Sequence, residues 1–480
     1  MNYSIIFYII GWILNLEAAF MLLSCMTAVI YGEKSGFAFL ITMAVCVAIG
    51  IPLTLKKPRK RAFYTKEGFV AVALSWIVLS IMGSVPFLLS GSLSSPVDAL
   101  FETVSGFTTT GASIFTDVEV LPHCILIWRS FTHWIGGMGV LVFILALLPL
   151  AGGYHMNLMK AESPGPSVGK LVPKVQSTAK ILYTIYFGLT VLQIVLLLIG
   201  KMPLFDTLCI SFGTAGTGGF GIRNDSVGGY STYIQVVVTI FMILFGVNFN
   251  VYFLLLTKKF IQAFKVEELR YYLGIIGASI LAIAINTAHM FDNIWVALQQ
   301  SAFQVGSIIT TTGYATTDFN QWPVFSKTIL VLLMFVGACA GSTGGGIKVS
   351  RLVILFKTVA KELHLYLHLN AIKKIKMDRK PIPHEVVRST NIFMAVYILI
   401  FAGSVLILGL DEYDLTTNFT AVAATLNNIG PGLELVGPTG NFSLFSPLAK
   451  CVLIFDMLAG RLEIFPLLLL FTKNTRKKFS

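Results

Sequence analysis

Four short segments of the sequence share a glycine-centred pattern that suits the coordination of a dehydrated metal cation. The clearest are FETVSGFTTTGAS, with Gly111, and FQVGSIITTTGYA, with Gly313; in both, a phenylalanine lies ten residues before the glycine. LCISFGTAGTGGF, with Gly218, and TAVAATLNNIGPG, with Gly430, are weaker matches. A dehydrated alkali ion needs several close oxygen ligands without strong charge, so that the ion can also leave. Backbone carbonyls and threonine hydroxyls meet this need, and glycine permits the positive φ that lets successive carbonyls point the same way.

The candidate ligands are the residues that close these four segments. A single TTTG is more simply an ordinary turn, but four such loops at corresponding positions favour one shared filter for a cation. The predicted filter residues are Thr109, Thr110, Gly111, Thr217, Gly218, Thr311, Thr312, Gly313, Asn428, Ile429 and Gly430.

The stretch before each loop is too short to cross a membrane. It follows a long apolar span and precedes another, and its roughly ten helical residues cover only about 15 to 18 Å, half the bilayer. Non-helical backbone at that depth needs protein or a water-filled cavity around it, so four such loops imply a shared polar axis. Ser95, Pro96 and Asp98 predict the start of the first short helix. The C-terminal ends of the short helices would favour a cation through the helix dipole.

Composition places most of the chain in lipid. Hydrophobic residues make up 55% of the 480 residues and charged residues only 12%, whereas soluble domains carry about a quarter charged residues. Apolar stretches of sufficient length predict an all-α polytopic membrane protein without a large soluble domain. The predicted spans are 5–30, 36–55, 68–90, 124–150, 178–200, 231–257, 271–290, 324–341, 390–410 and 445–472.

The net charge of +12 describes topology and does not indicate nucleic-acid binding, for which no motif is present. Of the 35 lysines and arginines, 28 lie in five clusters, and the positive-inside rule predicts that these clusters and both termini are cytoplasmic. Attraction to anionic membrane lipids is a secondary consequence. The clusters are 56–66, 160–180, 258–270, 348–388 and 473–478.

A glycine-rich stretch interrupts one apolar span. Glycine costs ~1 kcal/mol relative to alanine inside a helix, so a break is expected here, although a kink or a close-packing contact would also use glycine. GGGIKVS does not match the phosphate-binding pattern G-x-x-x-x-G-K-[ST], so we expect no nucleotide site in this chain. The stretch consists of Gly341, Ser342, Thr343, Gly344, Gly345 and Gly346.

Arg461 lies inside the last apolar span, in DMLAGRLEIFPLLLL. A charge there is costly by several kcal/mol unless it faces a cavity or a partner. Two hypotheses remain open: Arg461 projects into the pore beneath the filter, or it forms a buried ion pair with Asp456 or Glu463.

Six motifs together resemble the Trk/Ktr/HKT superfamily of potassium transporters, and bacterial Trk membrane subunits in particular, over essentially the whole chain. These motifs are SGFTTTGAS at 105–113, GTGGF at 216–220, TTTGYATTDF at 310–319, GSTGGGIKVSR at 341–351, NNIGPG at 427–432 and AGRLEIFP at 459–466. The resemblance implies four M1-P-M2 repeats, each like a potassium-channel subunit, around one central pore. It divides the chain into an N-terminal two-helix hairpin (1–60), repeat 1 (61–160), repeat 2 (161–268), repeat 3 (269–365), and a cytoplasmic linker with repeat 4 (366–480).

The resemblance also implies a function. It predicts potassium uptake across a bacterial inner (plasma) membrane, with potassium bound in the filter, an intramembrane gating loop at 341–346, and Arg461 as a barrier in the pore. In the family, serine in place of the first-repeat glycine accompanies sodium preference, so Gly111 favours potassium. A homodimer joined to a cytosolic TrkA-like nucleotide-binding (RCK-type) regulatory subunit is implied as well. Repeats two and four depart from the pattern because they lack TTTG.

Two other functions are less consistent with these features. A cation-coupled secondary transporter, with sodium or proton symport of potassium, would also contain interrupted spans, but its repeats are commonly inverted. Four parallel repeats with a short helix and loop favour a channel-like pore. A membrane enzyme would need a catalytic constellation, and neither HExxH nor a paired-carboxylate motif is visible, so we expect a transporter rather than an enzyme.

Overall fold

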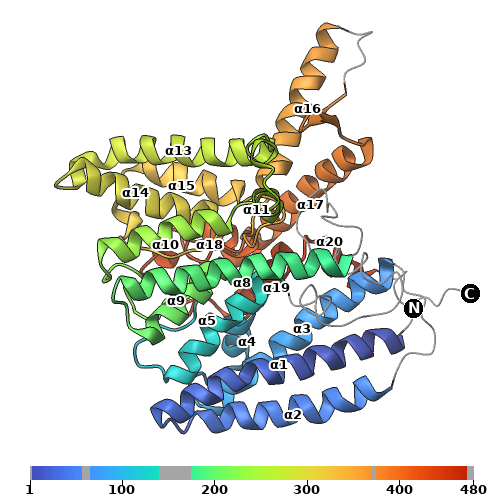
Figure 1. Cartoon of the computed structure of the whole chain (residues 1–480), viewed down its shortest axis with the longest axis vertical. Helices are drawn as coiled ribbons and strands as arrows, with labels where there is room; N and C mark the ends of the chain where they lie inside the picture. Colours follow the sequence, from blue (N-terminus) through green and yellow to red (C-terminus); the bar gives the residue numbers. More distant parts are fainter. Residues whose placement is uncertain (1–2, 57–64, 140–174, 369–373, 473–480) are drawn as a thin grey trace, which may run out of the picture.

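The computed structural model describes residues 3–56, 65–139, 175–368 and 374–472, which are predominantly helical. The long helices form one bundle, with α1 and α2 at one edge and α13 at the opposite edge (Figure 1). In the described residues, six helices are long and apolar enough to cross a membrane, and a seventh span is counted if one bent pair is included. The predicted all-α polytopic class is therefore confirmed.

The N-terminal hairpin consists of α1 (Tyr3–Tyr31) and α2 (Gly36–Leu55), as expected. The two helices approach closely where glycines of α2 face α1: a Cβ atom at Gly36 or Gly50 would lie within 3.0 Å of α1 side-chain atoms. Small residues permit such close packing of helices in lipid, where hydrophobicity alone does not hold helices together.

After the hairpin, a long helix, a short helix and a third helix follow one another four times, and in the last three groups the third helix is described in two pieces. The first group is α3 (Thr65–Leu89), α4 (Pro96–Phe107) and α5 (His123–Gly137). The second is α8 (Val175–Ile199), α9 (Leu204–Gly216), α10 (Thr232–Phe245) and α11 (Phe249–Leu256). The third is α13 (Glu267–Thr287), α14 (Ile294–Ile309), α15 (Val324–Val336) and α16 (Val349–Leu367). The fourth is α17 (His384–Leu408), α18 (Leu415–Leu426), α19 (Pro447–Arg461) and α20 (Phe465–Phe471). Short connecting elements are α12 (Phe260–Phe264), η1 (Ala288–Met290), η2 (Phe319–Gln321), η3 (Gly409–Asp411) and η4 (Glu434–Val436).

In the second and fourth groups, the third helix is interrupted inside a span that was predicted without a break, whereas in the third group a break was predicted. The predicted span 231–257 is two helices, α10 and α11, that are bent by 93°. The predicted span 324–341 ends as a helix at Val336. The chain is apolar on both sides of the bend between α10 and α11, so hydropathy alone does not reveal that bend.

Two further helices, α5 and α19, also end inside a predicted span. In place of the predicted span 124–150, α5 ends at Gly137 and Gly139 has a φ of 81°; residues 140–150 lie outside the described residues. In place of the span 445–472, α19 and α20 are separated at Glu463 and Ile464, whose φ values of 59° and 66° cannot continue a right-handed helix.

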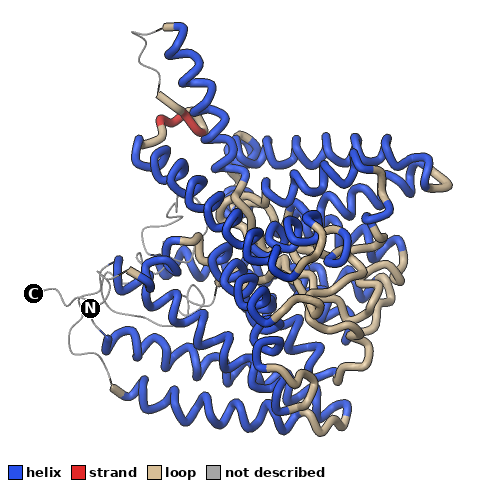
Figure 2. The backbone as a smooth tube through the Cα atoms, turned by 180° about the vertical axis from the view of Figure 1, so that it is seen from behind, coloured by secondary structure: helices blue, strands red, loops and turns tan. Residues whose placement is uncertain are grey.

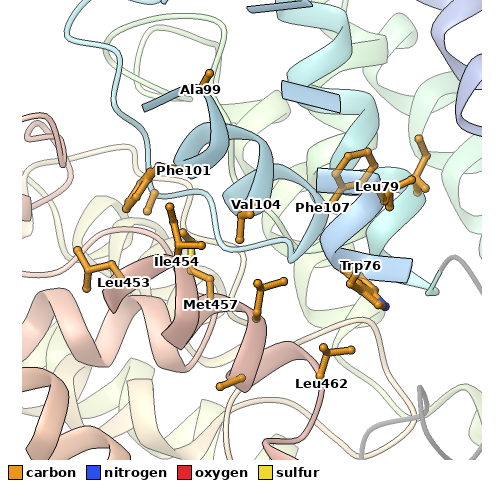
Figure 3. Packing of buried hydrophobic residues seen from close by; sticks show 14 of the residues in the cluster. Trp76, Leu79, Ala99, Phe101, Val104, Phe107, Leu453, Ile454, Met457 and Leu462 are labelled. Carbon is orange, nitrogen blue, oxygen red and sulfur yellow. The ribbon is translucent and has the colours of Figure 1, made fainter. Parts of the chain in front are cut away.

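The short helices α4, α9, α14 and α18 are held by packing and by their caps. Phe101, Val104 and Phe107 of α4 are buried between α19 and α3, where Leu453 and Trp76 contribute to the same cluster (Figure 3). The predicted start of α4 is confirmed, because Ser95 accepts a hydrogen bond from the Asp98 amide at 3.4 Å and Pro96 occupies the first turn.

The cap of α18 supports a prediction about stability. The carboxylate of Asp414 accepts a 2.9 Å hydrogen bond from the Thr417 amide, and bonding to the Thr417 hydroxyl lowers the pKa of Asp414. We expect Asp414→Ala to lower the free energy of unfolding by about 1 kcal/mol. Because the folded pKa is lowered, this stabilisation is present at neutral pH and lost as the pH falls through that pKa. Thermal unfolding of the wild type and Asp414→Ala in detergent, at pH 7 and at pH 3, measures the difference in their free energies of unfolding. If this difference were the same at both pH values, the stabilisation could not come from the ionised Asp414 carboxylate.

Beyond the third group, the chain leaves the bundle. α16 projects away from it (Figure 1), and a short hairpin of β1 (Lys376–Met377) and β2 (Lys380–Pro381) lies at its base (Figure 2). Lys357 of α16 pairs with Glu267, whose amide donates a 2.7 Å hydrogen bond to Asp378 of the hairpin. Much of the predicted linker is therefore ordered against the start of α13.

Candidate functional site

Each short helix ends in the same backbone turn. The second residue before the loop glycine takes a left-handed conformation, with φ of 56° at Thr109, 55° at Thr217, 59° at Thr311 and 55° at Asn428. Left-handed backbone costs an ordinary residue about 1 to 2 kcal/mol, so the surroundings must hold it. In the first and third groups, Thr110 and Thr312 supply part of that support: their hydroxyls bond to those of Thr108 and Thr310.

The four loops form a closed ring. A Cβ atom added to Gly111 would lie against the carbonyl oxygen of residue 218, one on Gly219 against that of residue 312, and one on Gly313 against that of residue 429. The ring closes at Gly430, where a Cβ atom would lie 2.7 Å from the carbonyl oxygen of residue 110. All four glycines have positive φ and line one cavity of about 150 Å³. Each loop is thus in backbone contact with the next, through a carbonyl oxygen that faces the neighbouring glycine.

The ring corrects the predicted equivalence of Gly218 with the other filter glycines. The amide of Gly218 bonds to the carbonyl five residues earlier, as do those of Thr110, Thr312 and Ile429. Gly219, with a φ of 79°, therefore occupies the position of the other loop glycines. Gly218 is small for a different reason, because a Cβ atom there would meet the imidazole ring of His133.

The glycine-rich segment lies directly against the ends of the short helices. The amide of Gly345 donates a 2.6 Å hydrogen bond to the Thr311 hydroxyl, and a Cβ atom on Gly345 would lie 2.5 Å from the carbonyl of residue 427. On its other side, Thr343 bonds through its hydroxyl to the Phe245 carbonyl at 3.2 Å, at the bend between α10 and α11. The predicted helix break is confirmed and is longer than expected, running from 337 to 348.

Arg461 bridges this segment and the first group. Its guanidinium donates to the Thr343 carbonyl at 2.9 Å, to the Thr109 hydroxyl at 3.3 Å and to the carbonyls of Gly136 and Gly137 at the end of α5. Of the two acids considered as ion-pair partners, Glu463 pairs with Arg351, and Asp456 accepts a 2.8 Å hydrogen bond from Ser404. A positive charge thus lies between the loop that follows α4 and the glycine-rich stretch 341–346.

The comparisons with known proteins agree with this architecture. Residues 35–277 and 274–480 match the TrkH family, described as cation transport proteins. The chain belongs to the TrkH family. Among its relatives are the Trk system potassium uptake protein TrkH of Salmonella typhimurium, 38% identical over 98% of this chain and 99% of that protein, and TrkG of Escherichia coli, 35% identical over 98% and 97%. The crystal structure of the potassium transporter TrkH from Vibrio parahaemolyticus superposes with a TM-score of 0.89 at 34% identity, covering 99% of this chain and all of that one.

In this TrkH family member, the sequence did not predict the buried polar side chains that contact the loops of the first and second groups. Arg129 of α5 and Glu102 of α4 form a 2.8 Å ion pair that is almost fully buried. One turn after Arg129, the imidazole of His133 bonds to the Gly106 carbonyl at 2.8 Å and accepts from the Phe220 amide at 3.2 Å. The detectable signal was a charged residue, Arg129, within the predicted span 124–150.

Glu268 is a second residue that was missed. Its buried carboxylate accepts hydrogen bonds from the amides of Ala340 at 2.7 Å and Ser350 at 3.2 Å, which lie before and after the glycine-rich stretch 341–346. Asn248, at the bend of the second group, donates to the same carboxylate at 3.4 Å. Glu268 looked like an ordinary acidic residue of a helical first turn, and only the fold brings it to this segment.

The described residues contain no group of three or more His, Cys, Asp or Glu side chains able to hold a metal ion.

Proposed function

We propose that this protein takes up potassium across the cell membrane through one channel-like pore, whose filter is the ring of four loops. The observation that carries the proposal is the closed succession of carbonyl contacts from Gly111 through Gly219 and Gly313 to Gly430. In this arrangement, the carbonyls of residues 110, 218, 312 and 429 replace the hydration shell of the ion. The relatives named potassium uptake proteins support potassium as the ion.

The segment 341–346 and Arg461 act as the gate. Gly345 contacts Thr311 and residue 427 at the ends of α14 and α18, Thr343 bonds to the Phe245 carbonyl, and Arg461 adds a positive charge beside Thr109; these contacts support the proposal. A cation leaving the filter would meet both this charge and the loop. Conduction therefore requires the loop and Arg461 to move aside.

We further propose that the protein works as a homodimer with a cytosolic TrkA-like nucleotide-binding (RCK-type) regulatory subunit. The name "Trk system" of the relatives supports an assembly of several components. The ordered α16 and its hairpin, outside the main bundle, would provide the contact surface (Figure 1). The five basic clusters support cytoplasmic termini in a bacterial plasma membrane and contact with anionic lipids.

Planar-bilayer recording of the purified protein tests the pore. With potassium and sodium gradients, the reversal potential of a potassium-selective pore lies close to the potassium equilibrium potential. Accumulation of potassium in liposomes against its own electrochemical gradient, driven by a sodium or proton gradient, would favour the coupled symporter instead. Absence of any monovalent-cation flux, with the regulatory subunit present, would remove the pore hypothesis.

Gly111→Ser is expected to reduce discrimination between potassium and sodium while retaining flux. The new side chain displaces the carbonyl of residue 218, which lies between two glycine α-carbons and can rotate at little cost. One ligand then leaves the ring, and we expect the permeability ratio to fall by about tenfold, equivalent to ~1.4 kcal/mol. Bi-ionic potentials measure the ratio, and Gly188→Ser, at a helical position with open space, is the matched control. An unaltered ratio in Gly111→Ser would contradict the filter assignment.

A further inference from the structure

A buried ion pair stands behind the filter loops of the first two groups. The side chains of Arg129 and Glu102 are 2% and 0% exposed, and their Nε and Oε1 atoms are 2.8 Å apart. Removing two charges from water is expensive, and their mutual attraction repays this only when the remaining donors and acceptors are also bonded. The partners of the remaining hydrogen bonds of Arg129 and Glu102 therefore show which parts of the chain the ion pair fixes in place.

The remaining hydrogen bonds of the pair go to two different filter loops. Glu102 accepts from the Ile114 amide at 2.8 Å and from the Ser113 hydroxyl, just after Gly111. Arg129 donates to the Ser113 hydroxyl and, at 3.2 Å, to the carbonyl of Gly221, two residues after Gly219. The ion pair thus connects the residues that follow Gly111 (loop 1, first group) to the residues that follow Gly219 (loop 2, second group).

Two aromatic rings also contact the guanidinium group of Arg129. The central carbon of Arg129 lies 4.2 Å from the ring centroid of Phe220 and 5.3 Å from that of Phe115. Phe220 directly follows Gly219, and its amide is bonded by His133 on the same face of α5. Cation–π attraction in a desolvated site adds to the hydrogen bonds, so loop 2 is held through side chain and backbone.

The corresponding positions in the other groups are different. Nine residues before the ring glycine, the third group has Gln304, whose amide donates at 3.4 Å to Thr316 and Thr317 of its own loop. The second and fourth groups have Ile210 and Ala421 at this position. Among these four positions, only Glu102 carries a charge, and its ion pair joins neighbouring loops.

We propose that Glu102 and Arg129 are positioning residues for ion selectivity: they fix the separation of loops 1 and 2 so that the ring fits potassium and does not contract around sodium. The proposal rests on the filter function given above. Sodium, the smaller ion, is bound well only if the ring carbonyls can move closer to it. The Glu102–Arg129 ion pair fixes the positions of loops 1 and 2 and so opposes that movement. Selectivity, rather than rate, is therefore the property that the pair sets.

Arg129→Gln and Arg129→Lys test this proposal together. Glutamine removes the charge and the fork of donors, whereas lysine restores the charge but cannot bond Glu102, Ser113 and Gly221 in the same geometry. We expect the potassium-to-sodium permeability ratio to fall by about tenfold, ~1.4 kcal/mol, in Arg129→Gln, with partial recovery in Arg129→Lys. Rubidium flux into liposomes should change by less than about twofold, since the carbonyl ligands themselves remain.

Ser113→Ala and Arg270→Gln complete the series. Ser113→Ala removes one hydroxyl from the pair and is the variant least able to disturb folding; we expect a smaller fall in the permeability ratio in the same direction. Arg270, exposed on α13, is the control for loss of an arginine charge, and the permeability ratio of Arg270→Gln should equal that of the wild type.

Melting temperature in detergent is measured for every variant. A lower melting temperature in folded Arg129 variants with an unchanged permeability ratio, or an unchanged ratio in Ser113→Ala, would overturn the positioning role and leave an ordinary structural ion pair. If the wild-type protein itself conducts no monovalent cation, the proposed function fails and this inference fails with it. A selective wild type with unaltered variants contradicts only the inference.

Discussion

Gly219→Ala is expected to lower potassium flux by about a hundredfold or more. Alanine at a φ of 79° is strained, and its Cβ atom would overlap the carbonyl of residue 312. The two costs together are about 3 kcal/mol, which corresponds to about a hundredfold. That carbonyl cannot move aside easily, because the Thr312 hydroxyl is bonded to Thr310 at 2.7 Å. Rubidium uptake into liposomes measures the loss.

Two further glycines give this prediction its internal controls. Gly274→Ala, on α13 with nothing within 4 Å of the new atom, should leave flux unchanged. Gly430→Ala should have an intermediate effect, since its Cβ atom would lie 2.7 Å from the facing carbonyl oxygen, the mildest overlap in the ring. Equal flux in the Gly219 and Gly274 variants would show that Gly219 does not belong to the ring.

Deletion of 341–346 is expected to raise potassium conduction by about tenfold or more. The deletion removes the Thr343 carbonyl from Arg461 and the Gly345 amide from Thr311, and the loss of even one net hydrogen bond, ~1.4 kcal/mol, shifts the open population by tenfold. The ends of the segment are already adjacent, because the Val349 amide bonds to the Ala338 carbonyl at 3.1 Å. The shortened chain can therefore close without moving α15 or α16. Open probability in single-channel records is the measurement.

Arg461→Met tests whether the segment 341–346 acts as a gate or only as a packing element. Because Arg461 and the loop are direct partners, each change alone should raise conduction, and the combined variant should show less than the sum of the two effects on a logarithmic scale. Unchanged open probability after the deletion, in protein that keeps its melting temperature, would make the segment a packing element.

Local sequence patterns carried much of the fold. Long apolar stretches predicted the six unbroken spanning helices, and Ser95 with Pro96 predicted the start of α4. These features depend on residues close together in the chain, where composition and capping act directly. The interruptions of α5, α10 and α19 could not be predicted in this way, because the chain stays apolar on both sides of each break.

The choice of loop glycine in the second group could not be made from the sequence. The motif GTGGF contains two adjacent glycines, Gly218 and Gly219, and the sequence prediction chose Gly218. The choice is decided by three-dimensional contacts: Gly219 faces the loop of the third group, and Gly218 faces the imidazole of His133. Glu102 with Arg129, and Glu268 with the two sides of its loop, were likewise hidden because their partners lie 27 and more than 70 residues away in the chain.

The ring of four loops is made by one polypeptide, and this has a genetic consequence. In a pore built from four identical chains, one codon change alters every quarter of the filter at once. Here, a change at Gly111, Gly219, Gly313 or Gly430 alters a single quarter and leaves three carbonyl neighbours in place. With the filter function proposed above, ion preference can therefore change one quarter of the ring at a time, and the sequences of the four loops are indeed unequal.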